Sequence, residues 1–213
     1  MDIFLRRRLL LAALATTALG ACGQKTPKMQ ALPAHAAILA LGDSLTQGVG
    51  AKPHEAWPTL LEERTDWEVI NAGISGHTSA QALERLPDLL DEHQPALVIV
   101  CIGGNDFLRQ MSAQAAKDNI RRICQQVQAS GAQVLLVAVP QFSLLAAGTG
   151  RLSDHPLYQE LAKELKIPLL EGAWAEILSK PQWRSDQVHA NAEGYAQFAQ
   201  KMQVFMHEHG WLK

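Results

Sequence analysis

Three residues have the types and spacing needed to build a nucleophile. Ser44 follows an apolar run directly in the stretch ILALGDSLTQG, residues 38–48. A serine hydroxyl is a weak nucleophile and needs a neighbouring base, for which histidine is suited because its pKa lies near neutrality. His189 can be that base, and Asp186, three residues earlier in DQVH, can hold its ring. These residues predict attack on a carbonyl carbon. The alternative is that Ser44 only caps a helix.

The same chemistry needs hydrogen-bond donors for the negative charge that develops on the carbonyl oxygen. Two further polar stretches follow apolar runs and offer such donors. NAGISGHTS, residues 71–79, contains Gly76, and IGGND, residues 102–106, contains Asn105. The sequence therefore holds one candidate set of nucleophile, base, carboxylate and donors.

The strands and helices that position these residues can be predicted from an alternation of short apolar runs and longer helical patterns. LVIVCI and VLLVAV are apolar on both faces, which is typical of parallel strands covered by helices. The predicted strands are 37–41, 67–71, 97–102, 133–139 and a weaker 167–170. The predicted helices are 56–64, 79–92, 113–130, 157–165 and 191–209.

This alternation predicts an α/β fold, a flavodoxin-like three-layer α/β/α sandwich with a five-stranded parallel sheet. In such a sheet the reactive groups gather outside the carboxyl ends of the strands. Each candidate stretch follows a predicted strand or precedes the last helix, so all should meet on one rim. That convergence favours catalysis by Ser44 over capping alone.

Four sequence blocks carry a family resemblance. LGDSLTQG, NAGISGHTS, IGGND and DQVH, in this order and spacing, resemble the blocks of the GDSL, or SGNH, hydrolases. The resemblance covers roughly residues 37–205. AWPTLLEE, LERLPDLLDEHQPALVIV and KPQW resemble the branch that contains thioesterase I/lysophospholipase L1 and bacterial arylesterases. The resemblance implies a serine hydrolase that works without a cofactor.

The resemblance also implies roles for single residues. Ser44 resembles the nucleophile, His189 the base and Asp186 the carboxylate that holds the base. The backbone N–H groups of Ser44 and Gly76 and the side-chain amide of Asn105 resemble the oxyanion hole. We expect Asp43 to support the turn before the nucleophile, and Asn71 to pin the loops by hydrogen bonds. We expect no metal site.

Two stretches depart from the family pattern. Ala190 follows the base where the family has proline, which removes no catalytic atom. Residues 141–156, QFSLLAAGTGRLSDHP, replace a loop that in close relatives contains tyrosine and asparagine and shapes the acyl-binding groove. The substrate therefore cannot be copied from those relatives.

The N-terminal residues resemble an export signal. Arg6–Arg8 precede the apolar run 9–19, which is too short to span a bilayer, and LGAC ends at Cys22 like a bacterial lipobox. We expect residues 1–21 to be a lipoprotein signal peptide, 22–36 a lipidated cysteine with a tether, and 37–213 the hydrolase domain. The alternative is an ordinary signal peptide or an uncut anchor. The lipobox predicts an exported protein, anchored to a bacterial membrane and facing the periplasm or the cell surface.

Composition and charge limit the classes of molecule that the protein is expected to bind. The 213 residues carry a formal charge of −2, and removal of residues 1–21 takes away three arginines and Asp2, which gives −4. A mildly acidic chain has no general electrostatic attraction to nucleic acid. We expect a monomer. Cys101 lies in an apolar run and Cys124 in a helical pattern, so we expect both to be buried and unpaired.

The sequence therefore predicts a serine esterase that hydrolyses small acyl esters or lipids through an acyl-enzyme on Ser44. One alternative is a carbohydrate or peptidoglycan O-acetylesterase, which the low aromatic content of 6% mildly disfavours. The other is a flavodoxin-like binding protein, which would need more hydroxyl residues than GDSLTQGVG offers to cradle a phosphate.

Overall fold

Five parallel strands form the central sheet in the order β2-β1-β3-β4-β5. The computed structural model describes residues 29–141 and 152–212. Its strands are β1 (Ala37–Gly42), β2 (Glu68–Gly73), β3 (Leu97–Cys101), β4 (Gln133–Val137) and β5 (Leu169–Leu170). The predicted parallel sheet is thus confirmed, and the reversal of strand order between β1 and β3 is the point where flavodoxin-like folds place their sites.

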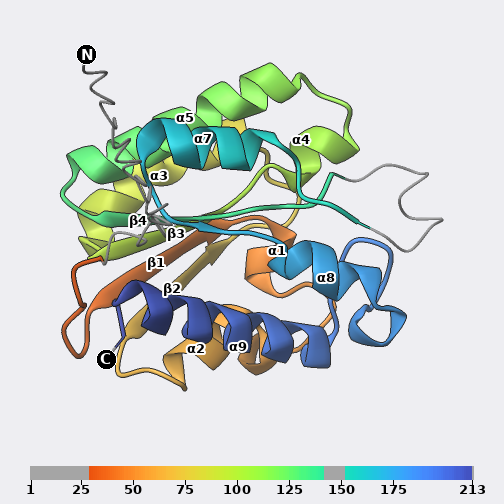
Figure 1. Cartoon of the computed structure of the whole chain (residues 1–213), viewed down its shortest axis with the longest axis horizontal. Coiled ribbons are helices and arrows are strands. Elements are labelled where there is room, and N and C mark those ends of the chain that lie inside the picture. The colour runs from red at the N-terminus through yellow and green to blue at the C-terminus, as the bar shows by residue number, and fades with distance from the viewer. Residues whose placement is uncertain (1–28, 142–151, 213) are drawn as a thin grey trace, which may run out of the picture.

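Helices cover both faces of this sheet (Figure 1). On one face lie α3 (Ser79–His93), α5 (Ala113–Ala129) and α7 (Leu157–Leu165), and α2 (Trp57–Glu62), α8 (Ala173–Ser179) and α9 (Ala192–His209) lie on the other. Two short helices, α1 (Ser44–Gln47) and α4 (Gly104–Leu108), follow β1 and β3, and 3₁₀ turns occupy Pro53–Glu55 and Pro181–Trp183. The three-layer prediction is confirmed.

The strands are buried because their residues are apolar on both faces. All five residues of β3 are buried, as are the last five of β1. Register pairs Gly42 at the end of β1 with Gly73 of β2 and Cys101 of β3, so the three strands end level with one another. This level edge brings the loops after β1, β2 and β3 together.

The predicted helices were close to those observed, and two short ones, α4 and α8, were missed. The sequence also placed the start of a helix at Ser44, and this helix is α1. Pro87 lies inside α3 without ending it. Both described cysteines are free and buried, as expected, and the Trp174 indole N–H lies 3.3 Å from the Cys101 sulfur.

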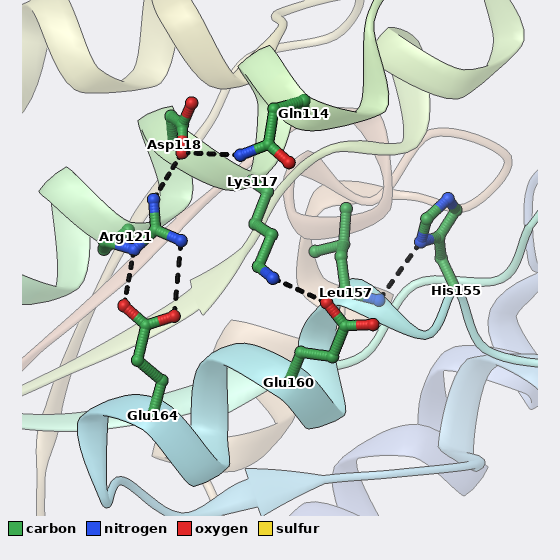
Figure 2. Close-up of polar contacts among 8 residues, drawn as sticks. All are labelled: Gln114, Lys117, Asp118, Arg121, His155, Leu157, Glu160 and Glu164. Carbon is green, nitrogen blue, oxygen red and sulfur yellow. Dashed lines mark hydrogen bonds and ion pairs between the residues drawn. The ribbon is translucent and has the colours of Figure 1, made fainter.

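Two ion pairs join α5 to α7 along their exposed sides (Figure 2). The Lys117 ammonium lies 2.5 Å from the Glu160 carboxylate, and the Arg121 guanidinium donates two hydrogen bonds to Glu164, at 2.7 and 3.2 Å. These pairs link the two helices, although such exposed pairs contribute little to stability in water.

The start of α7 also supports α4. The His155 ring accepts a hydrogen bond from the Leu157 N–H at Nδ1, 3.2 Å away (Figure 2). The same ring stacks on Phe107 of α4 with ring centroids 4.3 Å apart. Buried Tyr158 donates from its hydroxyl to the Ile102 carbonyl at 2.7 Å, directly before the loop that begins α4. The packing of α7 therefore determines where α4 lies.

The N-terminal part of the chain is described only from Met29. The proposed signal peptide and Cys22 lie outside the described residues, as do residues 142–151 of the loop that departs from the family pattern. Residues 29–36, expected to belong to a tether, instead contact the domain: the Met29 N–H donates to the His209 carbonyl at 2.8 Å and the Leu32 N–H to that of Trp211 at 3.1 Å. Among the described residues, no helix is long and apolar enough to cross a membrane.

Candidate active site

Ser44 is the first residue of α1, directly after the turn that ends β1. The cap of this helix is Asp43, whose Oδ1 accepts a hydrogen bond from the Leu45 N–H at 3.1 Å. Ser44 is therefore not the capping residue, and Asp43 supports the turn as expected. The serine hydroxyl is left for other contacts.

Close backbone packing holds α1 against the strand ends. A Cβ on Gly73 would lie 2.1 Å from the backbone nitrogen of Gln47, and a Cβ on Gly42 would lie 2.0 Å from the Thr46 hydroxyl oxygen. Real Cβ atoms do not approach other heavy atoms so closely, so both positions require glycine. Because the two glycines let α1 lie directly on β1 and β2, the position of Ser44 is set by backbone packing.

The loop that carries the candidate base is a small closed hairpin. Arg184 and Ala190 form an antiparallel bridge, and the Ser185 N–H donates to the His189 carbonyl at 3.1 Å. Ala190, where the family has proline, is fully buried. Asn191 caps α9 by accepting from the Gly194 N–H at 3.0 Å, so the hairpin ends where α9 begins.

A chain of hydrogen bonds connects the three residues predicted to act together. The His189 Nε2 atom lies 2.9 Å from the Ser44 Oγ, and the His189 Nδ1 atom lies 2.7 Å from the Asp186 Oδ2. The other Asp186 oxygen accepts from the backbone N–H groups of Val188 and His189, each at 2.8 Å. The carboxylate is thereby fixed toward its own histidine, and the imidazole toward the serine. This arrangement can generate a serine nucleophile.

The two carboxyl groups near Ser44 have opposite pKa shifts. Burial raises the pKa of Asp43 to about 7, and the Leu45 N–H only partly offsets this. Partial burial opposes ionisation of Asp186, but hydrogen bonds from the His189 ring and from the Val188 and His189 N–H groups outweigh it and lower the pKa of Asp186. Asp186 is therefore the carboxylate that stays charged beside the base.

The predicted donors line one small cavity with the serine and histidine. Ser44, Gly76, Asn105 and His189 border a cavity of about 130 Å³ formed by the described residues. Gly76 has a φ of +79°, in the left-handed region that favours glycine. The structure thus brings together every predicted site residue among those described. Cys22 lies outside them.

Three consecutive contacts from α4 and its end hold the loop that carries Gly76, and we name Asn105, Asp106 and Arg109 the α4 clasp. The Arg109 guanidinium donates to the Gly76 carbonyl at 2.8 Å, and the Asn105 amide donates to the His77 carbonyl at 3.0 Å. Buried Asp106 accepts from the N–H and the hydroxyl of Ser79, at 2.8 and 2.6 Å. The clasp therefore fixes the backbone on either side of the Gly76–His77 peptide.

Other elements hold the same loop from the side of α1. The Ser75 N–H donates to the Gln47 side chain at 2.7 Å, and the Gly73 N–H donates to Asn71 at 3.0 Å. Asn71 also donates to the Gln47 carbonyl at 3.5 Å, so it pins the loops as expected. Arg85 of α3 donates to the carbonyls that end β1 and β2, those of Gly42 and Ala72.

Sequence reasoning missed Arg109 and Arg85, which lie outside the motif blocks, and Gln47, which lies in LGDSLTQG but was given no role. Among the described residues, no group of three or more His, Cys, Asp or Glu side chains could hold a metal ion. Asp154 lies away from the cavity and accepts a hydrogen bond from the Gly172 N–H at 2.6 Å.

Comparison with known proteins identifies a family model and similar relatives. The family model described as GDSL-like Lipase/Acylhydrolase matches residues 40–197. The chain is 42% identical over 164 residues to the thioesterase 1/protease 1/lysophospholipase L1 of Escherichia coli K12, covering 73% of this chain and 76% of that one. It is 33% identical over 159 residues to an arylesterase of Vibrio mimicus, with 70% and 76% covered.

A solved structure resembles this one in fold. The psychrotrophic esterase EstA from Pseudoalteromonas sp., in a structure inhibited by monoethylphosphonate, aligns with a TM-score of 0.70 and 26% identity. The alignment covers 81% of this chain and 97% of that one.

Replacing Arg109 by methionine should slow ester hydrolysis, because the Gly76 peptide loses the contact that holds its carbonyl. We expect kcat to fall about tenfold with KM nearly unchanged, since the oxyanion develops only in the transition state. Arg122→Met removes the same charge from an exposed position on α5 and is the matched control. Equal kinetics for the two variants would show that Arg109 does not position this loop.

Asp43→Asn should change how stability depends on pH. In the folded protein the pKa of Asp43 is raised from 3.8 to about 7, so its protonated form favours folding below pH 3.8 and that stability is lost as the pH rises through 7. Urea unfolding at pH 5 and pH 8 should therefore show that the variant gains stability relative to the native chain at the higher pH. An identical difference at both pH values would contradict the raised pKa.

Proposed function

The chain belongs to the GDSL-like lipase/acylhydrolase family and is a serine esterase, and we propose that Ser44, His189 and Asp186 carry out its reaction. The observation that carries this assignment is the chain of hydrogen bonds from Asp186 through His189 to the Ser44 hydroxyl. The flavodoxin-like binding alternative shares the fold but not this family.

The reaction proceeds in two halves. His189 takes the Ser44 proton at Nε2 while the serine oxygen attacks the ester carbonyl carbon, and Asp186 stabilises the charged imidazole. The resulting oxyanion accepts hydrogen bonds from the Ser44 and Gly76 N–H groups and the Asn105 amide. His189 then gives its proton to the departing alcohol oxygen, which leaves an acyl-enzyme. Water, deprotonated by His189, attacks this ester and releases the acid and the free serine.

The size and lining of the cavity support a substrate with a short acyl group. Its volume of about 130 Å³ is far below the 300–1,000 Å³ usual for sites that enclose a drug-sized ligand. Leu45, Leu108 and Val188 line it beside the reacting groups. Leu108 is 44% exposed, and Ile74, two residues before Gly76, is 41% exposed. We therefore assign the cavity to a short acyl chain and the apolar rim to the alcohol portion of the ester, such as an aryl group.

The cellular setting is also a proposal. Arginines, a short apolar run and LGAC support export, cleavage before Cys22 and attachment of lipid to its thiol. More than one acyl chain is needed for stable anchoring, and a diacylated cysteine supplies it. The anchored enzyme faces the periplasm or the cell surface and acts as a monomer.

Ser44→Ala and His189→Ala should each lower kcat for p-nitrophenyl butyrate by about 10⁴-fold or more, because the nucleophile or its base is lost. Asn105→Ala should cost on the order of 10²–10³ in kcat, as one oxyanion donor is removed. An alkyl phosphonate ester should add its mass to the native chain and not to Ser44→Ala. Undiminished activity in Ser44→Ala would refute the assignment.

A series of p-nitrophenyl esters from C2 to C16 should show kcat/KM at C2–C6 at least about tenfold above that at C12–C16, because the longer chains exceed the cavity. A maximum sharply at C2 would favour the O-acetylesterase alternative. A maximum at C12 or beyond would contradict the short-acyl assignment and point to a lipid substrate.

A further inference from the structure

The first described residues are fixed at the end of the domain opposite the catalytic cavity. The Met29 N–H donates to the carbonyl of His209, the last residue of α9. Gln30 exchanges two hydrogen bonds with the side chain of Gln133, the first residue of β4, at 3.2 and 2.9 Å. The cavity lies at the other ends of these elements, beyond the last residues of the strands and before the first residue of α9.

The lengths of α9 and β1 give the distance between the Met29 end of the domain and the cavity. The 18 residues of α9 rise about 27 Å at 1.5 Å per residue, and His189 stands three residues before its start. β1 runs in the opposite direction along the same length of the domain, with its six residues rising about 20 Å toward Ser44. Both are buried in one core, so Met29 and the cavity are held about 27 Å apart along the domain.

The chain between Cys22 and Met29 is too short to bridge this separation. Seven Cα–Cα steps, at 3.3–3.6 Å each when fully extended, span at most about 25 Å. To place the cavity on the bilayer, Met29 would have to lie at least 27 Å above it and to one side. A flexible chain of seven residues spans only about 15 Å on average, so it holds Met29, and not the cavity, near the bilayer.

We propose that the catalytic face of the anchored enzyme points away from the bilayer that holds its lipid, so that lipids of that bilayer are not its substrates. This inference rests on the proposed anchor at Cys22. The substrate is then an ester with a short acyl group and an apolar alcohol that reaches the rim from the aqueous compartment. We assign its apolar part to Leu108, which lines the cavity and is exposed.

Two dye positions on one helix test the orientation. Met111→Cys lies just before α5 at the cavity end, and Ala129→Cys ends α5 about 25 Å away. Cys101 and Cys124 are buried and will not label. Lipidated protein is bound to phospholipid vesicles that carry acceptor-labelled lipids, and energy transfer from each dye to the surface is measured. Intact mass must first show the lipid on Cys22.

Transfer from the Ala129→Cys dye should exceed that from the Met111→Cys dye about twofold or more, given the length of α5. A 20-residue Gly/Ser insertion between Lys25 and Thr26, whose mean span is about 25 Å, should reduce the difference. Equal or reversed transfer in the native chain would overturn the inference. A chain without lipid on Cys22 would instead refute the anchor and withdraw the inference with it.

The same vesicles test whether the enzyme hydrolyses esters in solution or esters in the bilayer that anchors it. p-Nitrophenyl butyrate in solution should be hydrolysed at equal kcat/KM by the native and lengthened proteins. A phospholipid in the anchoring vesicle that carries a p-nitrophenyl butyrate ester on its headgroup should be hydrolysed about tenfold faster by the lengthened protein, since only the insertion allows the cavity to reach it. Equal and measurable hydrolysis by both would show that the native chain reaches its own bilayer, while loss of butyrate hydrolysis in both would refute the esterase assignment.

Discussion

The hydrogen bond between the Ser44 hydroxyl and the His189 ring joins residues 145 positions apart in the chain. Its 2.9 Å length depends on two backbones meeting without side chains between them. A Cβ on Gly50 would lie 2.1 Å from the Ser185 hydroxyl oxygen and 2.4 Å from the Ala190 carbonyl oxygen. The segment after α1 therefore lies directly against the His189 hairpin, and the Tyr195 hydroxyl donates to the Val49 carbonyl at 2.7 Å, which ties α9 to the same segment.

Burial separates the roles of two carboxyl groups in this small region. Asp43 is 2% exposed, has a pKa raised by burial to about 7, and uses one oxygen to cap α1. Asp186 is exposed on the His189 hairpin, where the backbone N–H groups of Val188 and His189 hold one oxygen and the His189 ring contacts the other. The aspartate beside the serine in sequence is thus structural, and the distant one supports the base.

The sequence predicted the sheet well because strands buried on both faces leave continuous apolar runs, as LVIVC does in β3. It missed α4 because the residue that precedes that helix, Gly103, has a φ of +121° and no side chain to cap it, and because the helix is held by Phe107 stacking on His155. The site residues could be found from four blocks, since each ends a strand or closes the last loop. Arg109 and Gln47 could not, because their partners are backbone atoms that only the folded chain brings near.

One helix relates the catalytic centre to the point where the N-terminal chain joins the domain. Asn191 caps the first turn of α9 beside the His189 hairpin, and the last residue, His209, accepts from Met29. Trp174 stacks on Phe198 in the middle of α9 with centroids 3.9 Å apart, and Trp57 packs edge-on against the same ring at 5.3 Å. Because these buried aromatics fix α9 to the rest of the core, the direction in which the cavity faces relative to Met29 is a property of the rigid domain. Only the length of chain before Met29 can change what that cavity reaches.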